Sequence, residues 1–241
     1  MSKIFLHIAA RKESQGIKNK NEKKFLGKPL INWSIDFSKK MKIIDSIIVN
    51  SDSKRILRIS KKAGANILIK RPKKFSSSKT SKLIAWKYAY KYLKDKKILK
   101  DSDIFVDLDC TCPVRSSKDF LKMINLYKSL IKKRIIFDGI FTITEAKKNP
   151  YFNLVEKNKL GFLKISKKTK KKITRRQDTP SVFEHVANTY IINPKFLKKA
   201  KDFMSGKFIG FKVDKYYSWD IDDNFDFKIA EFLAKTRKQN V

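Results

Sequence analysis

The run Ile4-Phe5-Leu6-His7-Ile8-Ala9-Ala10, followed by the polar loop Arg11–Asn21, decides the class of fold. The run is mostly apolar and has the length of a buried strand, and a polar loop containing a glycine follows where that strand would end. Ser46–Asn50 and Ile104–Leu108 are further apolar runs that also lead into polar loops. This repetition predicts a set of parallel strands that each end in a polar loop.

Segments with helical spacing of apolar residues separate these strands. Strands that alternate with helices predict a three-layer α/β/α fold, in which a mainly parallel sheet is covered by helices on both faces. The predicted helices are Leu30–Met41, Ser53–Ala63, Lys79–Leu93, Lys118–Leu130 and Asn224–Ala234, and the further strands are Asn66–Ile69, Phe137–Thr144, Asn188–Asn193 and Phe208–Val213.

The 241 residues are predicted to form one domain, residues 1–241, because no internal repeat or low-complexity linker divides them. The regular alternation is lost only in an excursion at residues 142–186. Within it, Asn153–Lys157 and Gly161–Ile165 predict a small hairpin, and Lys167–Gln177 is a strongly basic loop.

The charge is extreme, with 58 Lys and Arg against 23 Asp and Glu and a formal net charge of +35. A basic surface attracts phosphate, so an RNA-binding protein is one interpretation. The basic residues recur in every polar stretch, however, which favours a lysine-rich surface and argues against a nucleic-acid partner. No run of about 18 apolar residues and no signal peptide is found, so we expect a cytoplasmic protein with no membrane partner.

The first polar loop is the main candidate site, because ligands of open parallel sheets bind outside the carboxyl ends of the strands. Gly16 allows close backbone approach, Ser14 and Asn21 offer neutral hydrogen bonds, and Arg11 and Lys20 supply cations. This is the composition of a triphosphate cradle. The spacings of a Walker A loop and of a dinucleotide fingerprint are both missing, so a solvated basic loop is the alternative.

A second candidate site contains Asp220 and Asp222, two residues apart near the C-terminus. In an extended segment both carboxylates lie on one side, about 7 Å apart. Two carboxylates, completed by substrate phosphates, are a normal way to hold Mg²⁺. The alternative is a helix cap for the segment that begins near Asn224, and both roles are compatible if Asp223 is the cap.

Both sites resemble motifs of the acylneuraminate cytidylyltransferase (CMP-sialic acid synthetase) family. Arg11–Asn21 resembles its R-x-x-S-x-G-[IL]-x-x-K-N loop, Asp107–Arg115 its L-x-x-T-S-P-L-R segment, and Ser218–Asp222 its metal-binding S-[IF]-D-I-D. Asp107-Leu108-Asp109, Asn149–Glu156 and Thr174–Gln177 are most similar to the branch that acts on legionaminic acid. These matches occur in chain order and span nearly the full length.

The resemblance implies a Rossmann-like nucleotidyltransferase fold and a homodimer that exchanges a protruding segment, here residues 142–186. It also implies a reaction in which CTP and a nine-carbon sugar acid give a CMP-sugar and pyrophosphate with Mg²⁺. Arg11, Lys20 and Asp222 are the expected catalytic residues. The implied CTP contacts are Arg11, Ser14, Gln15, Gly16, Lys20, Asn21, Arg71 and Ser81; the sugar contacts are Lys82, Asp109, Thr111, Arg176, Gln177 and Tyr190; the metal ligands are Asp220 and Asp222.

Several of these positions have a second interpretation. In this second interpretation, Arg71 and Ser81 only order their loop, the Lys82 side chain is solvated, and Tyr190 packs in the core. Asp109 is either a sugar ligand or a weak general base. The chain also departs from the family pattern at Gln15, Cys112 and Val186, where the family carries Lys, Ser and Asn. The alternatives are therefore a different sugar acid, such as an eight-carbon one, or a catalytically degenerate member.

Overall fold

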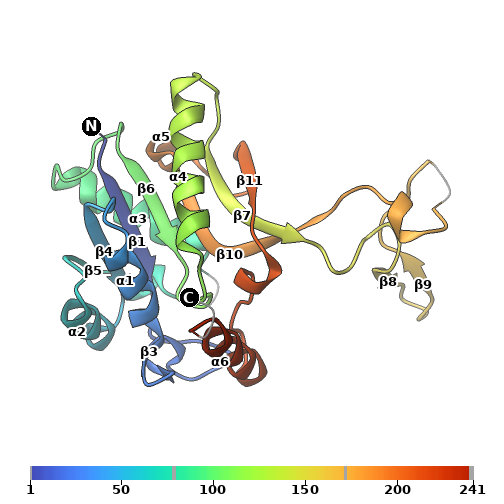
Figure 1. Cartoon of the computed structure of the whole chain (residues 1–241), viewed down its shortest axis with the longest axis horizontal. Helices are drawn as coiled ribbons and strands as arrows, with labels where there is room; N and C mark the ends of the chain where they lie inside the picture. Colours follow the sequence, from blue (N-terminus) through green and yellow to red (C-terminus); the bar gives the residue numbers. More distant parts are fainter. Residues whose placement is uncertain (1, 78–79, 171–172, 239–241) are drawn as a thin grey trace.

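The computed structural model describes residues 2–77, 80–170 and 173–238 and is built on one seven-stranded sheet (Figure 1). The strand order is β11-β7-β10-β6-β1-β4-β5. Among the described residues, β10 alone runs antiparallel to its neighbours, so the prediction of a mainly parallel sheet is confirmed. The strands are β1 Ile4–Ala9, β4 Ser46–Ser51, β5 Ile67–Lys70, β6 Ile104–Leu108, β7 Gly139–Glu145, β10 Phe183–Ile192 and β11 Phe208–Lys212.

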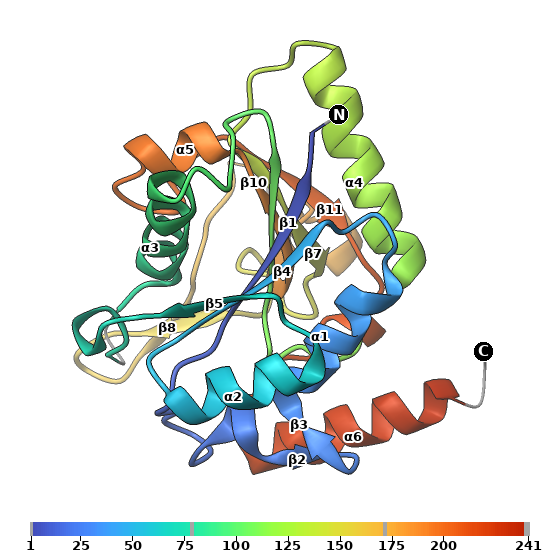
Figure 2. The ribbon, with the colours of Figure 1, turned by 90° about the vertical axis from the view of Figure 1, so that its left-hand side faces the viewer.

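Helices cover both faces of this sheet, which confirms the three-layer α/β/α prediction (Figure 2). One face packs against α1 Leu30–Lys40, α2 Lys54–Ala63 and α4 Ser117–Lys132. The other packs against α3 Lys82–Asp95 and α5 Pro194–Lys199. The last helix, α6 Asn224–Lys238, forms a separate apolar cluster with the segment that follows β1.

Side-chain alternation along the central strands decides which residues reach which layer. On β1, Leu6 faces the α1 layer and Phe5 faces the α3 layer. On β6, Val106 and Phe105 divide in the same way. Polar residues of these strands that share a face with the two phenylalanines therefore lie under the start of α3.

The structure corrects two predicted elements and adds two that sequence reasoning missed. β10 begins at Phe183 and not at Asn188, because its exposed first residues carry little apolar pattern and are held by pairing with β7. The helix expected from Lys79 begins at Lys82, and Lys79 itself lies outside the described residues. The six-residue α5, begun by Pro194 after the Asn193 cap, was too short for periodicity to reveal. A small hairpin was also missed, formed by β2 Lys24–Phe25 and β3 Lys28–Pro29.

The predicted excursion is an arm that projects from the sheet (Figure 1). Its first and last residues still belong to β7 and β10, so the projecting part is 146–182 and not 142–186. The predicted hairpin is confirmed as β8 Val155–Lys157 paired antiparallel with β9 Leu163–Ile165. Among the described residues, none of the helices combines the length and the apolar character needed to cross a membrane.

Four short 3₁₀ turns complete the described chain. They are η1 Lys20–Glu22, η2 Lys73–Phe75, η3 Arg176–Asp178 and η4 Lys215–Tyr217. η1 continues the first polar loop, and η3 lies on the arm.

Candidate active site

A cavity of about 340 Å³ lies beside the polar loops that follow β1, β5 and β6. Its walls come from segments far apart in the sequence, because the carboxyl ends of parallel strands meet at one edge of the sheet. Most of the predicted site residues line it: Arg11, Ser14, Gln15, Gly16, Lys20, Asn21, Arg71, Ser81, Lys82, Asp109, Thr111 and Asp222.

The first loop is fastened to the loop near the C-terminus by close backbone contacts. Gly16 lies so near the other chain segment that a Cβ added to it would be 2.0 Å from the carbonyl oxygen of Asp222. The buried Lys20 ammonium donates a hydrogen bond to the Ile221 carbonyl and lies 3.7 Å from an Asp222 carboxylate oxygen. Within the loop, the Asn21 amide donates to the Arg11 carbonyl at 3.0 Å. The cradle and the acidic loop therefore form one unit.

Two guanidinium groups face the cavity from opposite loops. Arg11 donates to the Ser77 carbonyl at 3.1 Å, and the almost fully buried Arg71 donates from Nε to the Ser76 hydroxyl at 2.9 Å. Burial lowers the pKa of Arg71, and the nearby Arg11 charge lowers it further against the opposing effect of Asp52. Two mutually repelling cations that line one cavity are suited to an anionic ligand.

The acidic pair has the oxygen donors that Mg²⁺ prefers. Asp222 lines the cavity and 84% of its side chain is exposed. Asp220 is largely buried, and its Oδ1 has no hydrogen-bond partner among the described residues. Burial and the neighbouring Asp109 charge raise the pKa of Asp220 to about 6, against the opposing effects of the Thr111 hydroxyl and the Lys20 charge. The exposed Asp222 carboxylate in this basic cavity, with Asp220 two residues away in the chain, offers oxygen ligands that fit a magnesium ion shared with substrate phosphates.

The helix cap that was the alternative role of the acidic pair is provided by a neighbouring residue. The Asp223 carboxylate accepts hydrogen bonds from the amides of Phe225 and Asp226 at 2.8 and 2.9 Å. Asp226 in turn accepts from the amides of Asp222 and Asp223. Asp223 thus caps α6, and the side chains of the acidic pair take no part in the cap.

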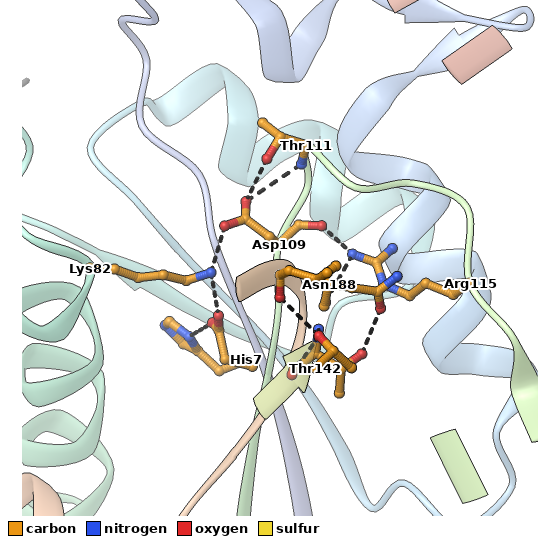
Figure 3. A network of polar contacts seen from close by, with 10 residues as sticks. His7, Lys82, Asp109, Thr111, Arg115, Thr142 and Asn188 are labelled. Carbon is orange, nitrogen blue, oxygen red and sulfur yellow. Dashed lines mark hydrogen bonds and ion pairs between the residues drawn. The ribbon is translucent and has the colours of Figure 1, made fainter. Parts of the chain in front are cut away.

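Sequence reasoning predicted Lys82 and Asp109 but missed His7 and Asp107, which belong to the same buried polar cluster beside the cavity (Figure 3). His7 Nδ1 lies 2.6 Å from Asp107 Oδ1, and both side chains are fully buried. Lys82 Nζ lies 2.8 Å from Asp107 Oδ2 and 2.6 Å from Asp109 Oδ2. The available signal was a polar residue in each of two otherwise apolar strands, at positions that share a face.

The protonation states of this cluster follow from burial and pairing. Burial lowers the pKa of His7 more than its Asp107 partner raises it, so the imidazole is neutral. Burial opposes the charge of Asp107, yet Lys82 and His7 bring its pKa down to about 2. Burial likewise opposes the charge of Lys82, and Asp107 and Asp109 raise its pKa well above its usual range. Lys82 is therefore ion-paired, and the solvated interpretation is wrong.

Arg115 fixes the backbone beside this cluster (Figure 3). Its guanidinium donates to the carbonyl of Asp109, to the carbonyl of Asn188 and to the Ser34 hydroxyl. Asn188 donates in turn to the Tyr217 carbonyl at 2.8 Å. These bonds hold the loop after β6 against β10.

Four predicted residues do not line the cavity: Asp220, Tyr190, Arg176 and Gln177. Tyr190 is buried against Trp86, with ring centroids 5.1 Å apart, which favours the core-packing interpretation. Arg176 and Gln177 lie in η3 on the arm, where Arg176 donates to the Ala146 carbonyl. Their sugar-binding role remains a prediction. The spacing of residues in the sequence gives no information on the direction in which the arm projects.

The departures from the family pattern occupy different environments. Gln15 lines the cavity. Cys112 is fully buried, and burial raises the pKa of its thiol to about 12. Val186 is buried in the sheet, where its carbonyl accepts a hydrogen bond from Thr142.

Comparisons with known proteins place the chain in one family. The sequence profile of the family described as "Cytidylyltransferase" matches residues 6–237. The chain is 33% identical to both the "Post-translational flagellin modification protein B" of Campylobacter coli and the "CMP-N,N'-diacetyllegionaminic acid synthase" of Campylobacter jejuni, each over 98% of this chain and 97% of the relative. A solved CMP:2-keto-3-deoxy-manno-octonic acid synthetase complexed with CTP has the same fold, with a TM-score of 0.70, 14% identity and coverage of 98% and 100% of the two chains.

Proposed function

Because this chain belongs to the cytidylyltransferase family, we propose that it transfers cytidine monophosphate from CTP to a nonulosonic acid of the legionaminic or sialic type and releases pyrophosphate. The observation that carries the proposal is the cavity at which the basic first loop, Arg71 and Asp222 meet. Such a cavity offers cations to a triphosphate and carboxylates to its metal ion at one place.

Negative charge accumulates on the phosphoryl oxygens as the anomeric hydroxyl of the sugar acid displaces pyrophosphate. We assign the stabilisation of this charge to Arg11 and Lys20. Ser14, Gln15, Gly16 and Asn21 complete the cradle with amide and hydroxyl groups, and Arg71 and Ser81 bind the base and ribose. The link between Lys20 and the Ile221 carbonyl supports this assignment, because it keeps the cradle in register with the acidic loop.

We assign Asp222 and Asp220 as the ligands of a Mg²⁺ ion. When bound, this ion supplies Lewis-acid stabilisation of the α-phosphate and lowers the pKa of the attacking hydroxyl. Two observations support the assignment: Asp220 Oδ1 has no hydrogen-bond partner in the part of the chain that the structure describes, and the Asp222 carboxylate is exposed.

We further propose that residues 1–241 act as one domain in a homodimer, with the arm of one copy completing the sugar site of the other. Three apolar side chains on the arm support this proposal: Leu160, Phe162 and Leu163 are 81%, 69% and 65% exposed in the single chain. A two-stranded hairpin is marginally stable alone and gains from packing on a partner. Arg176 and Gln177 would then contact the sugar acid from the partner's arm. A cytoplasmic location remains a prediction.

Incubation with CTP, Mg²⁺ and a panel of nonulosonic acids and an eight-carbon sugar acid, with pyrophosphate release as the measurement, tests the proposed function. We expect turnover with at least one nine-carbon acid. Turnover only with an eight-carbon acid would assign a different substrate, and CTP binding without any turnover would indicate a degenerate enzyme. RNA binding that survives Asp222→Asn, without CTP turnover, would refute the proposal.

A further inference from the structure

The buried cluster under the cavity is assembled at one level of three neighbouring strands. His7 on β1 and Tyr190 on β10 are both in register with Asp107 on β6. All three side chains are buried. Lys82, the first residue of α3, places its ammonium 4.3 Å from the centre of the Tyr190 ring.

Two carboxylates and an aromatic ring surround the Lys82 ammonium. Its nitrogen pairs with Asp107 at 2.8 Å and with Asp109 at 2.6 Å, and the Tyr190 ring covers a further side. Lys82 and Asp109 both line the cavity, so their ion pair fixes how the two side chains face it. Lys82 therefore acts on the orientation of Asp109.

With Lys82, Asp109 is a member of the cluster that lines the cavity. Its side chain is 23% exposed, and both carboxylate oxygens are held. Oδ2 pairs with Lys82, and Oδ1 accepts a hydrogen bond from the Thr111 hydroxyl at 3.1 Å. Contacts at both oxygens fix the orientation of the carboxylate and leave lone pairs for a hydroxyl donor in the cavity.

We propose that His7 is a positioning residue: with Asp107 it holds the Lys82 ammonium, and Lys82 orients Asp109 to accept a hydrogen bond from a hydroxyl of the sugar acid. The inference rests on the proposed function. Because Asp107 is ionised and can only accept, the shared proton belongs to His7 Nδ1. His7 Nε2 has no partner among the described residues, so the contribution of the imidazole is this one donated bond.

Leucine and asparagine provide a matched pair of variants at this buried position. They are similar in size, and only asparagine places an N–H donor near the position of Nδ1. We expect His7→Leu to raise the KM for the sugar acid about tenfold or more while the Kd for CTP changes less than about twofold. We expect His7→Asn to restore the KM to within about threefold of the wild type. Equal impairment in two folded variants, or no change in His7→Leu, would overturn the proposal.

Lysine ammonium signals in ¹⁵N NMR provide a test that needs no turnover. The Lys82 signal is identified by its absence in Lys82→Met. We expect it to be present in the wild type and in His7→Asn, and to be broadened or lost in His7→Leu. If His7→Leu does not fold, Asp107→Asn, which removes the paired charge at constant size, takes its place. A wild type that turns over no sugar acid refutes the proposed function alone, whereas an unchanged Lys82 signal in the impaired variant refutes the role of His7.

Discussion

Gly16→Ala tests whether the close contact between the two loops of the cavity is needed for catalysis. The new methyl carbon would lie 2.0 Å from the carbonyl oxygen and 3.0 Å from the carbonyl carbon of Asp222. Both are backbone atoms, so no flexible side chain can move aside. Relief of the clash needs a displacement of about 1 Å or more, because ordinary van der Waals contacts begin at about 3.5 Å.

The displacement would act directly on the proposed metal ligand. Asp222 follows Ile221, whose amide donates to the Thr111 carbonyl at 2.8 Å and whose carbonyl accepts from Lys20. A misplacement of about 1 Å at a site of this kind costs about 100-fold in rate, or about 2.7 kcal/mol of transition-state stabilisation. The overpacking itself is expected to lower the free energy of unfolding by about 1–3 kcal/mol.

The assay is kcat/KM for CTP at saturating sugar acid and Mg²⁺, together with urea unfolding. Gly27→Ala is the matched control, since Gly27 has a φ of +87° and, apart from its two chain neighbours, no described residue has an atom within 4 Å of an added Cβ. It carries a backbone strain of about 1–2 kcal/mol but does not line the cavity. We expect the control to lose stability and keep its turnover. If Gly16→Ala keeps a kcat/KM within about threefold of the wild type, the reasoning on loop contact is refuted.

Three further predictions concern the metal ligand, the cradle and the buried histidine. Asp222→Asn should lower turnover about 100-fold with a change in unfolding free energy below about 1 kcal/mol, because its charge is exposed; near-normal turnover with unchanged Mg²⁺ dependence would contradict the assignment. Gln15→Lys should tighten CTP binding by about 1 kcal/mol in calorimetry, and an unchanged Kd would mean that the triphosphate lies elsewhere. Burial keeps the pKa of His7 below its ordinary 6.5. As the pH falls through 6.5, the His7 imidazole of the unfolded chain therefore binds a proton before that of the folded chain does, and the native state loses stability. The difference in the free energy of unfolding between the wild type and His7→Asn should therefore decrease below about pH 6.5, by at most about 1.4 kcal/mol per pH unit. If urea unfolding gives parallel curves of this free energy against pH for the two proteins, the prediction is wrong.

The class of fold and the main candidate loops could be predicted from the sequence alone. Strand and helix periodicities are local properties, so Ile4–Ala10 predicted β1 to within one residue. The loop Arg11–Asn21 and the pair Asp220 and Asp222 could be recognised because each lies in one short segment of the chain. The parallel order of strands then brought most of the predicted residues to one cavity.

The contacts between segments far apart in the sequence could be seen in the tertiary structure and could not be predicted from the sequence. His7 and Asp107 are 100 residues apart, and their contact depends on the register of β1 against β6. Position 16 needs a glycine because the backbone of Asp222, 206 residues away in the sequence, lies too close for a Cβ. The burial of Tyr190 depends on the register of β10 against β6, which places it beside Asp107. Periodicity indicates which face a residue shares with its own neighbours, whereas strand order and register, set by the packing of the whole chain, decide what lies opposite that face.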